Sequence, residues 1–71
     1  MTKTTKEQVL EQMVDKSNVE IMQQEVMIAF YENIINEQTD EEAKNKYKIK
    51  QAQMQATLDF NKKFLAYVES L

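Results

Sequence analysis

Near the middle of the chain stands the sequence Asn36-Glu37-Gln38-Thr39-Asp40-Glu41-Glu42, with a stretch of about thirty residues on either side. Asn36 can adopt the left-handed backbone conformation that closes a helix, and Thr39 can cap the next helix with Glu42 as its capping-box partner. The acidic residues that follow Thr39 complement the positive end of the helix dipole. This segment therefore predicts that one helix ends and a second begins here.

The composition of the 71-residue chain favours helices throughout. The chain contains no Gly and no Pro, the residues that tight turns between strands use most. We therefore predict an all-α fold with helices at about residues 5–35 and 40–70. Thr4 with Glu7 and Thr5 with Gln8 form two overlapping capping boxes at the start of the first helix. We expect a single domain over residues 1–71, with residues 1–4 frayed.

A further capping box, Ser17 with Glu20, raises the alternative that a short first helix ends near Lys16. Against a break near Ser17, apolar residues recur every seven positions on both sides of it, at Val14, Ile21, Ile28 and Ile35. We favour one continuous helix. A helix of about thirty residues is about 45 Å long, whereas a compact globule of this chain length is about 29 Å across. The sequence therefore predicts a long antiparallel helical hairpin.

Both predicted helices carry more apolar residues than one neighbouring helix can cover, since one neighbour covers a stripe about 100° wide. The first helix has one stripe with Val19, Met22, Val26, Ala29, Phe30 and Ile34, and a second stripe on its far side. We expect the apolar residues that the neighbouring helix does not cover to contact another chain, and these are Ile21, Ile28, Tyr31, Ile35, Phe60, Phe64 and Tyr67. A second copy would give a homodimeric four-helix bundle with coiled-coil contacts, and a different protein is the alternative partner.

The distribution of charge favours the same layout. Residues 1–16 carry no net charge, residues 17–42 carry seven acidic residues and no basic one, and residues 43–71 carry six Lys and two acidic residues. An antiparallel hairpin brings an acidic stretch beside a basic one. Each exposed ion pair contributes only about 0.2 to 1 kcal/mol, so the charge pattern sets register more than stability.

Absent residue types argue against several classes of function. Without Cys or His there is no disulfide, no zinc site and no general base near neutral pH, and without Gly there is no phosphate-binding loop. We expect no enzyme, no cofactor and no metal. The longest apolar run, Val26 to Tyr31, is far shorter than the roughly 20 residues that span a membrane. We expect a cytoplasmic protein, and Lys, Asn and Ile use without Arg suggests a bacterial or phage genome.

These observations favour a small non-enzymatic protein–protein interaction module of the adaptor, co-chaperone or inhibitor type. An alternative is a dimeric nucleic-acid-binding regulator that contacts phosphates through Lys44, Lys48 and Lys62. The opening Met1-Thr2-Lys3, the two arms and the acidic junction resemble in layout the RNA-binding hairpin dimers that control plasmid copy number. The net charge of −3 and the absence of Arg favour the protein partner over nucleic acid. A structural filament subunit that associates head to tail is a third interpretation.

Overall fold

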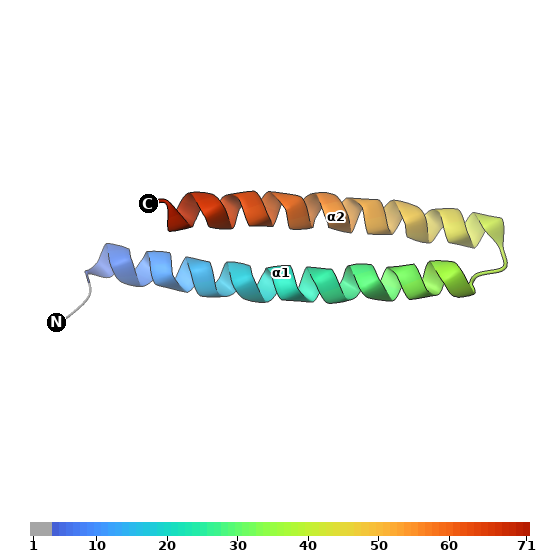
Figure 1. Cartoon of the computed structure of the whole chain (residues 1–71), viewed down its shortest axis with the longest axis horizontal. Coiled ribbons are helices and arrows are strands. Elements are labelled where there is room, and N and C mark those ends of the chain that lie inside the picture. The colour runs from blue at the N-terminus through green and yellow to red at the C-terminus, as the bar shows by residue number, and fades with distance from the viewer. Residues whose placement is uncertain (1–3) are drawn as a thin grey trace.

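The computed structural model describes residues 4–71, and the predicted fraying of residues 1–3 lies outside this range. Two helices, α1 (Thr5–Glu37) and α2 (Glu41–Glu69), run antiparallel and side by side, and the start of α1 extends beyond the end of α2 (Figure 1). The molecule measures 59 × 16 × 12 Å, with a radius of gyration of 16.8 Å. The predicted all-α fold, its hairpin arrangement and its elongated shape are confirmed.

The start of α1 follows the first of the two predicted capping boxes. The Thr4 hydroxyl accepts a hydrogen bond from the Glu7 backbone N–H at 3.2 Å, and the Glu7 carboxylate accepts one from the Thr4 N–H at 3.3 Å. Two backbone donors that the helix itself leaves unpaired are satisfied in this way. Thr4, which we expected to be frayed, is therefore part of the helix terminus.

The turn between the helices differs from the prediction in two respects. Asn36 lies inside α1 and does not close it, and no residue from 4 to 71 has a positive φ. Instead, Gln38 ends the helix in an extended conformation, with φ −75° and ψ 134°. The N-cap of α2 is Asp40 and not Thr39, and its carboxylate accepts from the Glu42 N–H at 3.3 Å. A carboxylate bonds this N–H as a hydroxyl would and adds a charge that the helix dipole favours.

Ser17 does not interrupt α1, so the alternative of a break at this residue is wrong. An N-cap residue needs an extended backbone, whereas Ser17 lies in the middle of a regular helix and is only 7% exposed. Its side chain faces α2, in phase with the apolar residues on either side of it. The packing between the helices therefore prevails over the local capping signal.

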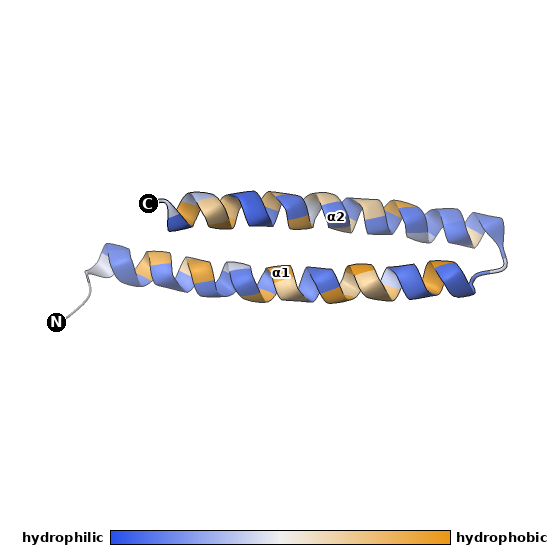
Figure 2. Cartoon of the chain, viewed as in Figure 1, coloured by the Kyte–Doolittle hydropathy of each residue, from blue (hydrophilic) through white to orange (hydrophobic). Residues whose placement is uncertain are grey.

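The contact between the helices is a regular seam. Its members are buried or half-buried and recur at alternating intervals of three and four residues, as expected for helices that pack along their full length. On the α1 side the seam consists of Leu10, Val14, Ser17, Ile21, Gln24, Ile28, Tyr31 and Ile35, with Gln38 directly after the helix. In α2 it consists of Lys44, Tyr47, Gln51, Met54, Leu58, Asn61, Leu65 and Val68. Figure 2 shows apolar segments along all of α1, whereas the part of α2 next to the turn is mainly hydrophilic.

Candidate docking surface

The four interface residues proposed on the first helix lie in the seam. Ile21 and Ile35 are buried, and Ile28 and Tyr31 are half-buried. The Tyr31 ring lies 6.3 Å from the ring of Tyr47 on α2. These residues therefore pack against α2 within the same chain. Their assignment to a leftover outer face is corrected by this placement, since the stripe that extends along the full length of α1 is the one that meets α2.

The outer stripe of α1, defined here as Val19, Met22 and Val26, was expected to face the second helix and instead points into solvent. Val26 is 68% exposed and Met22 is 60% exposed. Together with Gln23 and Met27 these two residues line a shallow depression on α1. The stripe lies away from the seam, because Val19 and Val26 are about half a turn from Ile21 and Ile28 around the helix and Met22 is about a third of a turn from Ile21.

The three interface residues proposed on the second helix are exposed, as the prediction required of them. Phe60 is 67% exposed and Tyr67 is 62% exposed, while Phe64 is covered further by the neighbouring helix. Nothing in a single hairpin covers the outer surfaces of these rings. Their role in binding another chain stays a prediction.

One broad side of the hairpin is formed by polar residues. Residues seven apart on a helix lie within about 20° of each other, so each helix contributes one row of residues to this side. All members of the two rows are exposed. We define this polar face as Glu11, Asn18, Glu25 and Glu32 from α1 with Lys48, Gln55, Lys62 and Glu69 from α2. Glu32 in the α1 row accepts a hydrogen bond of 2.8 Å from the amide of Gln51, a seam residue of α2.

The opposite broad side is mostly apolar. Each helix contributes two rows of residues to this side. One row lies next to the seam and the other lies beside it, farther from the neighbouring helix. We define this apolar face as Met13, Met27, Phe30 and Ile34 from α1 with Phe60, Phe64, Tyr67 and Leu71 from α2. Glu20 and Lys50 are the charged residues in its central rows. The hairpin therefore has one wettable side and one side that water solvates poorly.

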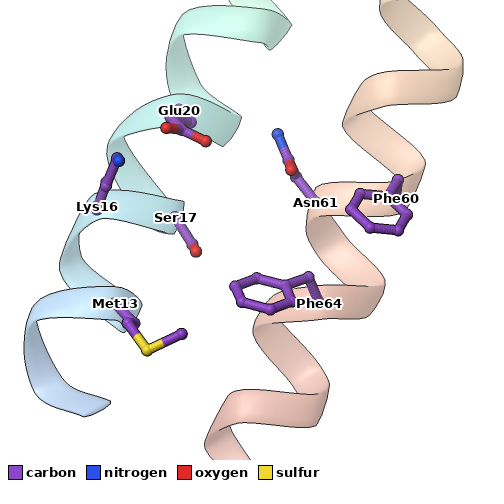
Figure 3. Close-up of a pocket in the computed structure, with 7 residues that line it drawn as sticks. All are labelled: Met13, Lys16, Ser17, Glu20, Phe60, Asn61 and Phe64. Atoms are coloured by element: carbon purple, nitrogen blue, oxygen red, sulfur yellow. The ribbon is translucent and has the colours of Figure 1, made fainter. Parts of the chain in front are cut away.

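A depression of about 370 Å³ opens on the apolar face between the helices (Figure 3). Phe64 and Asn61 project into it from α2, and Met13 and Ser17 project from α1 toward them. Ser17 is small, so the seam at this level lacks the volume that Ile or Leu fills elsewhere. The depression is therefore a gap in the packing between the two helices on this face.

The lysines considered for phosphate binding do not form a separate basic surface. Lys44 is half-buried at the turn end of the seam, while Lys48 and Lys62 are exposed on the polar face. There they alternate with carboxylates from α1, among them Glu25 and Glu32. Acidic neighbours weaken the attraction for a phosphate backbone.

Other features of the described residues add no further site. Within residues 4–71 no three acidic side chains come close enough together to hold a metal ion. Neither α1 nor α2 has an apolar stretch of the length that a lipid bilayer requires. Comparison of the chain with protein families, characterised proteins and solved structures gives no match.

Proposed function

We propose that the hairpin is a non-enzymatic protein-interaction module, of the adaptor, co-chaperone or inhibitor type, that packs its exposed apolar side chains against helices of other chains. The observation that carries this proposal is the contrast between a small core and a large apolar exterior. Among residues 4–71 the buried apolar residues are Ile21, Ile35, Leu58 and Val68. Phe60, Tyr67, Val26 and other large side chains are more than half exposed.

The total surface area supports the proposal. The hairpin exposes 5615 Å², whereas a compact monomer of 8.4 kDa exposes about 4,600 Å². The excess of about 1,000 Å² is close to the area that one partner contributes to a stable protein–protein interface, about 800 Å². A second copy of the chain is a natural first partner, in a four-helix bundle with coiled-coil packing.

The experiment is affinity capture with the hairpin as bait, from an extract of its native host, together with sedimentation equilibrium of the pure protein. The bait is compared with Phe60→Ala/Tyr67→Ala, which removes two exposed rings, and with the matched control Asn18→Ala/Gln55→Ala on the polar face. We expect the aromatic double variant to lose self-association or a captured protein that the control retains, while circular dichroism shows equal helicity.

The proposal is overturned if the pure hairpin is a monomer at all concentrations and the aromatic double variant captures the same proteins as the control. A mass that keeps increasing with concentration beyond the dimer indicates open-ended, head-to-tail association. In that case the chain is a filament subunit and the adaptor interpretation is wrong.

A further inference from the structure

We propose that the apolar face binds the apolar face of a second copy, with the two hairpins antiparallel, so that the turn of each lies beside the open end of the other. This inference rests on the proposed function and assigns it a face, a partner and an orientation. It assigns the outer stripe of α1 to the outside of the resulting four-helix bundle.

The dimensions of the face favour a second copy as its occupant. The face extends along a molecule 59 Å long and 16 Å wide, and both helices contribute large side chains to it. A single short peptide helix would cover only part of this length. Another hairpin of the same length covers all of it, and the excess surface of about 1,000 Å² matches what one protomer contributes to a standard interface.

Two charges in the central rows of the face, Glu20 and Lys50, favour one orientation, and Lys16 stands at the edge of the depression beside Glu20. Glu20 lines the depression together with Phe60 and Asn61, so it lies toward the open end of the hairpin. Lys50 directly precedes Gln51 in the chain, and the Gln51 amide donates to the Ile28 carbonyl oxygen at 3.3 Å. Lys50 is therefore level with residues 28–29 of α1, about nine residues or 14 Å from Glu20 along the axis.

A two-fold axis through the point midway between these charges places Glu20 of each hairpin level with Lys50 of the other. This midpoint is near residue 25 of α1, close to the middle of the stretch in which the two helices lie side by side. The antiparallel dimer can therefore satisfy its charges and overlap over almost its full length. With open ends together, Glu20 would meet its own copy and Lys50 would meet its own, which like charges in an apolar interface disfavour.

The face is tested with two neighbouring residues that point to different sides of α1. Met27→Asp places a charge on the apolar face, and Val26→Asp places the same charge on the outer stripe. In sedimentation equilibrium we expect the wild type at twice 8.4 kDa and Val26→Asp unchanged. Met27→Asp changes the same residue in both protomers, so each contact of Met27 is lost twice. We expect the dimer dissociation constant to increase about a hundredfold.

The charges are tested by exchange, which keeps the apolar side chains and so leaves folding little affected. Glu20→Lys alone and Lys50→Glu alone should each weaken the dimer, and the double exchange Glu20→Lys/Lys50→Glu should restore it. Glu25→Lys on the polar face is the matched control for the change of charge and should leave the dimer intact. Failure of the double exchange to restore the dimer overturns the proposed orientation.

The orientation has an independent readout, because the chain contains no Cys and a single one can be labelled cleanly. A spin label on Thr39→Cys marks the turn. The antiparallel dimer separates the two labels by roughly 40 Å, whereas a dimer with open ends together brings them within about 25 Å. A short distance between the two labels overturns the antiparallel arrangement. The choice of face is tested separately, by Met27→Asp.

The outcomes separate this inference from the proposed function. If Met27→Asp keeps the dimer and Val26→Asp loses it, the hairpin self-associates through the outer stripe, and the assignment of the apolar face is wrong. A wild type that stays monomeric but captures a host protein through Phe60 and Tyr67 overturns the second copy and leaves the proposed function intact. A monomer that captures nothing overturns both.

Discussion

Replacing Ser17 with alanine should make the hairpin more stable. Ser17 lies inside an unbroken helix and is 7% exposed in the seam. Alanine is the better residue for a helix interior by about 0.5 kcal/mol, and removal of a mostly buried hydroxyl adds up to about 1 kcal/mol. For a domain of this size each kcal/mol changes the melting temperature by about 4–8 °C. We therefore expect a rise of several degrees.

The opposite sign would identify Ser17 as a helix cap. If α1 broke at this residue, Ser17→Ala would remove a cap and cost about 1 kcal/mol, and the melting temperature would decrease. The measurement is thermal and urea unfolding followed by circular dichroism at one fixed protein concentration, because association makes the melting temperature depend on concentration. Asn18→Ala, one residue along and exposed on the polar face, is the control for the change in helix propensity alone. A Ser17→Ala variant that melts below the wild type refutes the continuous α1.

Three other predictions follow from the same geometry. Asp40→Ala should lower the free energy of unfolding by about 0.5–2 kcal/mol in urea unfolding, whereas Thr39→Ala should change it little, since the cap is Asp40; the reverse order would contradict the turn. Leu58→Ala, at a residue 3% exposed, should cost about 2–5 kcal/mol, and a loss below 1 kcal/mol measured by urea unfolding would argue against the seam. In a salt titration with duplex RNA or DNA we expect no binding at low salt, because the carboxylates of the polar face lie between Lys48 and Lys62; a steep decrease of affinity with salt would support the nucleic-acid alternative.

The helices and their outer ends could be predicted from local chemistry. Absence of Gly and Pro favoured helices, and the capping box of Thr4 with Glu7 is a signal contained within four residues. The turn was harder, because Thr39 and Asp40 are both good caps and stand next to each other. Which of them caps α2 depends on the backbone path of residues 38–40, and that path is set by how the two helices align over their whole length.

The number of apolar residues could not show which stripe of α1 packs against α2 and which faces outward, because the two stripes are similarly apolar. They differ in length. The outer stripe is confined to a few turns around Val26, whereas the seam continues in phase from Leu10 to Gln38. Continuity over the full helix is what a long partner helix requires. The seam is hard to recognise from the sequence because it includes polar residues such as Ser17 and Gln24. These residues interrupt a purely apolar pattern without changing its phase.

These polar members of the seam have a structural consequence of their own. The Asn61 amide donates to the Gln24 side-chain oxygen at 3.0 Å, and the Gln51 amide reaches the Ile28 carbonyl oxygen. A seam of Leu and Ile alone could slide by seven residues and keep its pattern, whereas such a slide would bring Asn61 level with Tyr31 or Ser17 and leave its amide without Gln24. Half-buried polar contacts of this kind favour one register at the expense of apolar burial. A 71-residue chain has little burial to spare, so in the proposed dimer the apolar face would supply the burial that the polar residues of the seam do not.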